Sequence, residues 1–161
     1  MTAKTFFELS RERAEFFGRA AFDEPMSAHT TFGIGGPADL YVRPAAECFV
    51  PYTATLLRLA RAGNIPVLIL GGGANLLVAD AGVRGIVLDT GSWSGTDSAA
   101  GKGAPEGTIV FRSGTLTDDA AHWAADNGYS GLEDFAGLPG TIGGAVWMNA
   151  RCFGSQISDI L

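Results

Sequence analysis

One stretch of the chain decides its fold: Ile65-Pro66-Val67-Leu68-Ile69-Leu70 followed by Gly71-Gly72-Gly73-Ala74-Asn75. The first six residues are a continuous apolar run of strand length, which is typical of a strand covered on both faces. The glycines follow it directly, at the place where α/β folds hold their ligands. Glycine lets backbone N–H groups come close to an anion, because it has no Cβ and tolerates positive φ. The stretch therefore predicts a buried strand that ends in an anion-binding loop.

The elements around this stretch predict a strand–helix–strand unit. Residues 3–22 have the pattern of one amphipathic helix, residues 38–42 that of a strand, and residues 44–62 that of a second helix. The apolar face expected for the second helix consists of Val50, Ala54, Leu57 and Ala60. With the strand at 65–70, this order predicts parallel strands joined by a helix. Further short strands are expected at 76–78 and 86–88.

A linker and a second α/β segment follow. Residues 91–107 are rich in Gly, Ser and Ala, which predicts a flexible connection between two lobes. Residues 108–112 have strand character, and Thr115 with Asp118 resembles the capping pair of a helix. The expected organisation is an N-terminal helix (1–22), a first lobe (23–90), the connection (91–107) and a second, incomplete lobe (108–161).

A second glycine-rich stretch, Pro139-Gly140-Thr141-Ile142-Gly143-Gly144, leads into a predicted helix. A helix N-terminus presents free N–H groups and a partial positive charge, and the Thr141 hydroxyl adds a donor. Two such loops could hold a pyrophosphate without a lysine. Neither loop has the G-x-G-x-x-G or the G-K-[ST] pattern. Glycines that only make tight turns remain the alternative for either loop.

Composition excludes several classes of protein. The 161 residues carry a formal net charge of −6 and contain no basic run, which argues against a nucleic-acid partner. No apolar stretch is long enough to span a membrane. Two cysteines and two histidines far apart in sequence predict no disulfide framework and no metal site, and they fit a reducing cytoplasm.

Five blocks together resemble one family. They are 24–32 (EPMSAHTTF), 35–38 (GGPA), 70–78 (LGGGANLLV), 131–133 (GLE) and 139–150 (PGTIGGAVWMNA). In order and spacing they are similar to the UDP-N-acetylenolpyruvoylglucosamine reductases, the MurB family. Each glycine block alone is weak, but the joint pattern over roughly 22–161 is specific.

The resemblance implies an α+β fold, the FAD-binding domain of the vanillyl-alcohol-oxidase/p-cresol-methylhydroxylase type, with two small α/β lobes. It also implies non-covalent FAD, NADPH as reductant, a UDP-sugar substrate and a role in peptidoglycan precursor synthesis. The FAD-contacting residues that it implies are Gly71, Gly72, Gly73, Ala74, Asn75, Leu76, Ser113, Gly114, Pro139, Gly140, Thr141, Gly143, Gly144 and Asn149.

The chain departs from the family pattern in two places. Most members have Gly-Ala-Tyr-Gly where this chain has Arg151-Cys152-Phe153-Gly154. The family's catalytic arginine, serine and glutamate and its substrate domain are expected after Leu161. No residue of this chain is therefore assigned as catalytic, and we expect little substrate-dependent turnover from it alone. Another FAD oxidoreductase of the same superfamily and a non-catalytic nucleotide-binding module are the alternative functions.

Other chemically active residues have structural explanations. His29 is expected to make a turn hydrogen bond, because no partner for acid–base work is evident. His122 is expected in solvent and Glu133 in a structural role, while Cys152 is expected to be inert. Trp147 is expected to pack in the core or between the lobes.

Overall fold

The computed structural model describes residues 2–97 and 107–161, and the chain divides at one point into two compact units. Unit 1 comprises Met1–Ser92 and unit 2 comprises Trp93–Leu161. Helices and strands occur in both units, which confirms the predicted α+β class. Among the described residues, no helix combines the length and the apolar character needed to cross a membrane.

Unit 1 is built on a four-stranded sheet with the order β1-β2-β4-β3. Its strands are β1 (Gly18–Pro25), β2 (Pro37–Pro44), β3 (Val67–Leu70) and β4 (Val83–Asp89). β1 pairs antiparallel with β2, whereas β2 and β3 both pair parallel with β4. The predicted parallel arrangement is confirmed, and β4 lies between the two strands that the helix connects.

β3 carries the apolar run, but it is an edge strand, and the prediction that both its faces are covered is wrong. Leu70 is buried, whereas Ile69 is 60% exposed. The buried strand is β4, in which Ile86, Val87 and Leu88 are each 2% exposed or less. A continuous apolar run does not by itself distinguish an edge strand from a central one, because strand order is set by pairing with distant segments.

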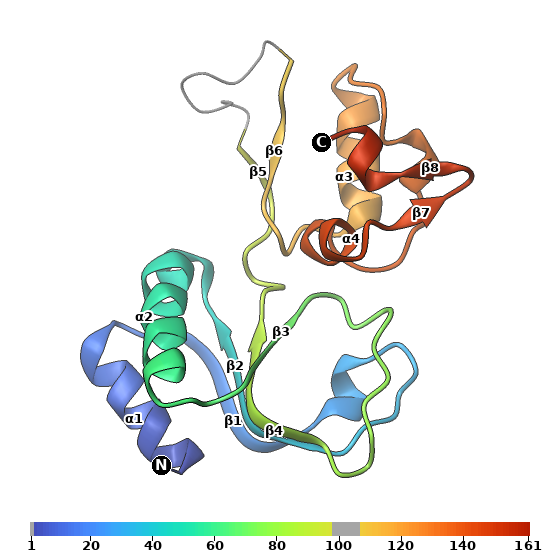
Figure 1. Cartoon of the computed structure of the whole chain (residues 1–161). Helices are drawn as coiled ribbons and strands as arrows, with labels where there is room; N and C mark the ends of the chain where they lie inside the picture. The colour runs from blue at the N-terminus through green and yellow to red at the C-terminus, as the bar shows by residue number, and fades with distance from the viewer. Residues whose placement is uncertain (1, 98–106) are drawn as a thin grey trace. The chain divides into compact units, whose positions relative to one another are not determined.

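Helices α1 (Ala3–Arg13) and α2 (Phe49–Ala62) cover one face of the sheet, and the short 3-10 turn η2 (Ala46–Cys48) leads into α2 (Figure 1). The core on this side consists of Phe6, Phe7, Leu40, Val42, Cys48, Tyr52, Leu56, Ala60 and Ile86. The hydroxyls of Ser10 and Tyr52 lie 2.7 Å apart in this core. These two buried groups therefore satisfy each other.

The predicted N-terminal helix over 3–22 is wrong beyond Arg13. The chain is extended at Ala14, and β1 begins at Gly18. Gly18 has a φ of 136°, and a Cβ there would lie 2.3 Å from the Arg43 carbonyl oxygen. Pairing with β2 therefore overrides the helical pattern of the second half. Phe16 and Phe22, which contribute to the apolar pattern of this stretch, both pack edge-on against Phe7.

α2 buries a different face from the one predicted. Its buried residues are Phe49, Tyr52, Thr55, Leu56 and Ala60, whereas Val50, Ala54 and Leu57 are exposed. Of the predicted face, Ala60 alone is buried. The helix carries two overlapping apolar stripes, and the one with Phe49 and Tyr52 has more apolar area to bury.

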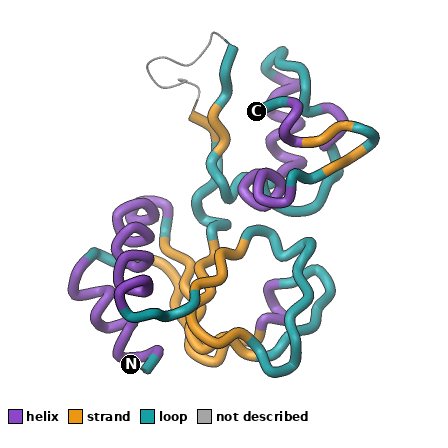
Figure 2. The backbone as a smooth tube through the Cα atoms, viewed as in Figure 1, coloured by secondary structure: helices purple, strands orange, loops and turns teal. Residues whose placement is uncertain are grey.

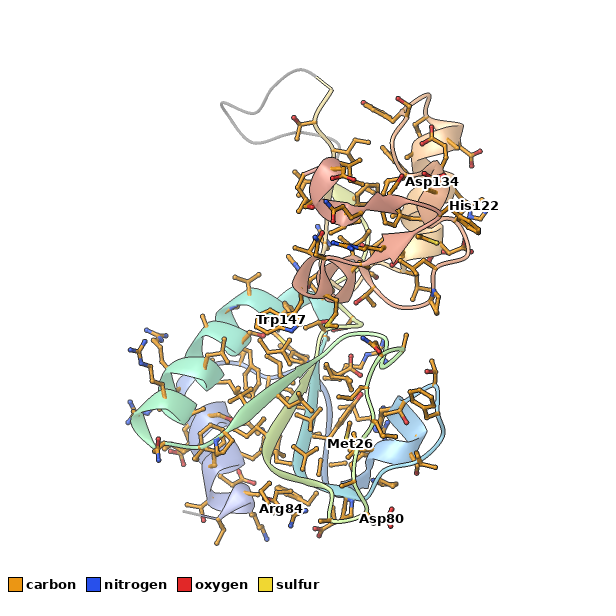
Figure 3. The ribbon with its side chains drawn as sticks, turned by 45° about the vertical axis from the view of Figure 1, so that its right-hand side comes forward. Met26, Asp80, Arg84, His122, Asp134 and Trp147 are labelled. Atoms are coloured by element: carbon orange, nitrogen blue, oxygen red, sulfur yellow. The ribbon has the colours of Figure 1, made fainter. Side chains whose placement is uncertain are left out.

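Two loops cover the other face of the sheet. They are residues 30–36, which follow the 3-10 turn η1 (Met26–His29), and residues 71–82 (Figure 2). The core beneath them consists of Met26, Ala38, Tyr41, Leu70, Val78 and Val87. Met26 lies between the sheet and these loops (Figure 3). The predicted strand at 76–78 is wrong, because this segment crosses the core as a loop that inserts Val78.

Unit 2 is made of short elements around a smaller core. They are β5 (Thr96–Asp97), β6 (Val110–Phe111), α3 (Thr117–Asp126), η3 (Glu133–Phe135), α4 (Ile142–Met148), β7 (Arg151–Cys152), β8 (Ser155–Gln156) and η4 (Ile157–Asp159). β5 pairs with β6 and β7 with β8, both antiparallel. Phe135, Ala145 and Ile157 form the core.

The predicted connection and helix cap of this region need correction. Thr96–Asp97 is a strand rather than part of a flexible connection, and residues 98–106 lie outside the described residues. The predicted strand at 108–112 shortens to Val110–Phe111. Thr115 does not cap α3: its hydroxyl donates to the Gly95 carbonyl oxygen at 3.0 Å, and Leu116 occupies the N-cap position.

The register of α2 can be tested with two neighbouring leucines. Leu56→Ala should lower the free energy of unfolding by about 2–5 kcal/mol, because it leaves a cavity in the core. Leu57→Ala should cost roughly 1 kcal/mol at most, because Leu57 lies on the exposed face. Urea unfolding followed by circular dichroism measures both. Equal losses, or a larger loss for Leu57→Ala, would contradict the assigned face.

Candidate functional site

The glycine loop, residues 71–75, begins where β3 ends. Leu70, the last residue of β3, pairs with Asp89, the last residue of β4. Because these strands are parallel, their carboxyl ends meet at one edge of the sheet, where open α/β sheets hold ligands. The glycine loop therefore lies at the carboxyl edge of the parallel strands, where ligands are commonly bound in such sheets.

The carbonyl groups of this loop are held by two threonines. The Leu70 oxygen accepts from both the N–H and the hydroxyl of Thr90, at 2.9 and 3.0 Å. The Gly73 oxygen accepts from the Thr31 N–H at 3.2 Å. The Ala74 oxygen accepts from the Thr31 hydroxyl at 3.3 Å. Thr90 and Thr31 thus fix three peptide groups in and next to the loop.

Fixing these carbonyls orients the N–H groups. In a trans peptide the C=O of one residue and the N–H of the next point in opposite directions, and the described chain has no cis peptide bond. The N–H groups of Gly71, Ala74 and Asn75 therefore point away from the threonines. No N–H group of residues 71–75 donates a hydrogen bond to another described residue. The loop is a set of unused donors, which suits an anion.

Gly73 is required by packing as well as by any ligand. Its φ is 65°, and a Cβ there would lie 2.0 Å from the carbonyl oxygen of His29. Of the three glycines in the triplet, all of them described, Gly73 alone has a positive φ. Close contact with the 29–31 segment therefore explains this glycine.

A polar network lies beneath the loop. His29 Nε2 lies 2.7 Å from Glu24 Oε1, and because the ionised carboxylate can only accept, the imidazole donates. The His29 ring stacks on Tyr41 with 4.3 Å between centroids. The buried Tyr41 hydroxyl donates to Asp89 Oδ2. Arg19 also pairs with Glu24. The network runs from the end of β1 to the end of β4.

The network shifts two pKa values in opposite directions. The hydrogen bond from His29 and the charge of Arg19 lower the pKa of Glu24, although burial opposes them. Burial and the neighbouring Asp89 raise the pKa of Tyr41 far above its ordinary value. Glu24 is therefore ionised and Tyr41 neutral at physiological pH.

This network predicts an acid-dependent stability. A carboxyl whose folded pKa is lowered stabilises the fold above its ordinary pKa of 4.5, and this contribution is lost as the pH falls through the folded value. The stability difference between wild type and Glu24→Gln should therefore shrink as the pH falls below 4.5. Thermal unfolding between pH 7 and pH 3 measures it. Glu47→Gln, at an exposed position of unit 1, is the control, and the same pH profile for both variants would contradict the prediction.

The second predicted loop, in unit 2, is arranged differently. Thr141 caps α4, as its side chain accepts from the Gly144 N–H at 3.4 Å. The N–H groups of Ile142 and Gly143 donate to the carbonyls of Thr115 and Ser113, at 2.8 and 2.9 Å. The N–H groups in the first turn of α4 are thus already bonded. The prediction that they are free to bind an anion is wrong for Ile142, Gly143 and Gly144. The N–H groups of Gly140 and Thr141 donate to no described residue.

The other predicted residues of unit 2 have internal partners. A Cβ at Gly143 would lie 2.8 Å from the Ser113 Cβ, so this glycine permits close packing. The Gly114 N–H donates to the Trp93 carbonyl at 2.8 Å. Asn149 ends α4 in the left-handed conformation, and its side chain bonds Gln156 and the Ser158 N–H. Contacts of these residues with FAD remain predictions.

A family model described as "FAD binding domain" matches residues 38–161.

The chain belongs to the FAD-binding domain family.

Several relatives of the chain are reductases of the same kind. It is 42% identical over 149 residues to the UDP-N-acetylenolpyruvoylglucosamine reductase of Desulfosudis oleivorans, covering 91% of this chain and 46% of the relative. It is 40% identical over 146 residues to that of Agathobacter rectalis, covering 86% of this chain and 45% of the relative. The crystal structure of the Thermus caldophilus enzyme matches with a TM-score of 0.63 and 31% identity, over 89% of this chain and 46% of that one.

These findings confirm the family resemblance, the fold class and FAD as the cofactor that the sequence predicted. The chain spans about half the length of the relatives that it matches.

The structure of this FAD-binding domain corrects the view of His29, which has a side-chain partner in Glu24. His122 is exposed, as predicted. Glu133 accepts from the Gly131 N–H at 2.6 Å, which agrees with a structural role. Trp147 is 87% exposed, so the prediction that it packs in a core is wrong within its own unit. Cys152 is half-buried and unpaired. No group of three metal-ligating His, Cys, Asp or Glu side chains occurs among the residues described.

Sequence reasoning missed Thr31 and Thr90 as residues that shape the loop. Both act on backbone carbonyls, and such contacts leave no spacing pattern in a sequence. Thr31 does lie in the block Thr30-Thr31-Phe32 that carries the family resemblance, and that was the available signal.

The role of Gly73 in this FAD-binding domain can be tested without cofactor. Gly73→Ala should destabilise the protein by more than roughly 1–2 kcal/mol, the cost of a left-handed residue, because the Cβ also meets the His29 carbonyl. Gly72→Ala, in the exposed middle of the triplet, should have a small effect. Thermal unfolding in the absence of FAD measures both. A mild Gly73→Ala phenotype would show that the 29–31 segment is not packed on the loop.

Proposed function

We propose that this chain is the FAD-holding part of a UDP-N-acetylenolpyruvoylglucosamine reductase. The observation that carries the proposal is the set of unused N–H groups at residues 71–75, aimed from the carboxyl edge of the sheet. The family match over 38–161 and the reductase relatives support it. The activity that we propose is the NADPH-dependent reduction of UDP-N-acetylglucosamine enolpyruvate to UDP-N-acetylmuramate in peptidoglycan precursor synthesis.

The donors of the glycine loop fit a pyrophosphate. A pyrophosphate needs several donors at short range, and backbone N–H groups meet this need without a counter-charge from lysine. Asn75 adds an exposed side-chain amide. In unit 2, the N–H groups of Gly140 and Thr141 likewise have no partner among the described residues and are candidate donors by themselves. These groups would bind and orient FAD by hydrogen bonding.

When bound, FAD would supply the redox chemistry, carrying a hydride from NADPH to the enolpyruvyl double bond. The residues of this chain would position the cofactor. None of them is assigned as the acid that protonates the product. The UDP-sugar substrate is proposed from the reductase relatives, and a cytoplasmic setting from the two unpaired cysteines.

The proposal predicts that the protein binds FAD and that the phosphates contribute to affinity. Titration of the 161-residue chain with FAD should quench flavin fluorescence to a saturating stoichiometry. Riboflavin, which has no phosphate, should bind far more weakly because it leaves the N–H groups of the loop unused. A chain that is folded by circular dichroism but binds neither FAD nor ADP would contradict the proposal.

A further inference from the structure

We propose that Thr31 is a positioning residue that pre-organises the glycine loop for the phosphates of FAD. This inference rests on the proposed function, since it concerns how the same loop binds its ligand. Thr31 is outside the set of residues that the sequence assigned to the cofactor.

The argument begins with the two donors of Thr31. Its N–H bonds the Gly73 oxygen and its hydroxyl bonds the Ala74 oxygen, at 3.2 and 3.3 Å. Two successive carbonyls are therefore turned toward one residue. By peptide planarity the N–H groups of Ala74 and Asn75 face the other way, side by side and without a partner among the described residues. A hydroxyl on one side of the loop thus sets the donors on its opposite side.

The backbone next to Thr31 is fixed by contacts of His29. Two residues earlier, the His29 side chain is fixed by Glu24 at 2.7 Å and by stacking on the buried Tyr41. The His29 carbonyl lies against Gly73, where a Cβ would come within 2.0 Å. The buried network therefore fixes the backbone on which Thr31 stands. A donor on a fixed backbone can hold the loop in its binding conformation before the ligand arrives, which lowers the cost of ordering on binding.

The neighbouring Thr30 offers a control, because its hydroxyl bonds a different part of the backbone. The Thr30 hydroxyl donates to the Ile34 oxygen at 3.0 Å, within its own turn, and makes no hydrogen bond to the glycine loop. Both threonines lie at the surface rather than in the core. Replacing either by valine removes one hydroxyl at nearly constant shape. The two positions form a matched pair that differs in which backbone the hydroxyl holds.

The test compares Thr31→Val, Thr31→Ser and Thr30→Val by titration with FAD and with ADP, together with thermal unfolding in the absence of ligand. Loss of one hydrogen bond that orients the donors should weaken FAD binding by Thr31→Val roughly three- to tenfold. Thr31→Ser keeps the hydroxyl and should bind nearly as wild type. Thr30→Val should also bind as wild type. ADP should lose affinity by the same factor as FAD, because the loop acts on the phosphates.

Four results would overturn the inference. The first is wild-type affinity in Thr31→Val, and the second is an equal loss in Thr31→Ser. The third is a loss for FAD without a loss for ADP, which would place the hydroxyl at the flavin ring. The fourth is an equal loss of FAD affinity and an equal fall in unfolding temperature in Thr31→Val and Thr30→Val, which would assign a structural role instead. Failure of the wild type to bind FAD would contradict the proposed function, so the two failures are distinguishable.

Discussion

A trans peptide group cannot point its oxygen and its hydrogen the same way, and the glycine loop of this protein depends on that constraint. Thr31 holds the carbonyls of Gly73 and Ala74, and Thr90 holds that of Leu70, so the N–H groups of Gly71, Ala74 and Asn75 face away from these threonines. The loop thereby presents unpartnered donors of the kind that an anion needs, without a basic side chain. That agrees with the acidic composition of the chain, whose net charge is −6.

The rest of unit 1 can be understood as support for this arrangement. The parallel pairing of β3 with β4 brings Leu70 beside Asp89 and places Thr90 where it can reach the Leu70 carbonyl. The contacts among Glu24, His29 and Tyr41 connect β1 and β2 to residues 29–31, the segment that is hydrogen-bonded to the loop. The helices α1 and α2 lie on the opposite face of the sheet from the glycine loop and bury the larger core.

Particular residues show how far the sequence could be followed. The apolar run at 65–70 correctly predicted a strand. Its position in the sheet could not be predicted from this run, and β3 proves to be an edge strand with Ile69 exposed. The amphipathic pattern of residues 3–22 did not reveal the change from helix to strand, because β1 forms by pairing with β2, a distant segment, and Phe16 and Phe22 pack against Phe7 in that arrangement. At Pro139 to Gly144 the glycines were recognised, yet Gly143 is explained by contact with Ser113. A local sequence pattern indicates which residues favour burial, but it does not indicate which distant segment they pack against.

The sequence by itself determined the family, the α+β class and the place of the glycine loop after a strand, because these depend on motif order and on the conformational freedom of glycine. Only the tertiary structure decided which N–H groups of that loop are available. That choice depends on Thr31, which is 43 residues away from Ala74 in the chain. A contact across such a separation exists only once the sheet has formed, so no local pattern could have encoded it. The glycines of residues 71–73 allow many backbone conformations, and hydrogen bonds from Thr31 and Thr90 hold the loop in one of them.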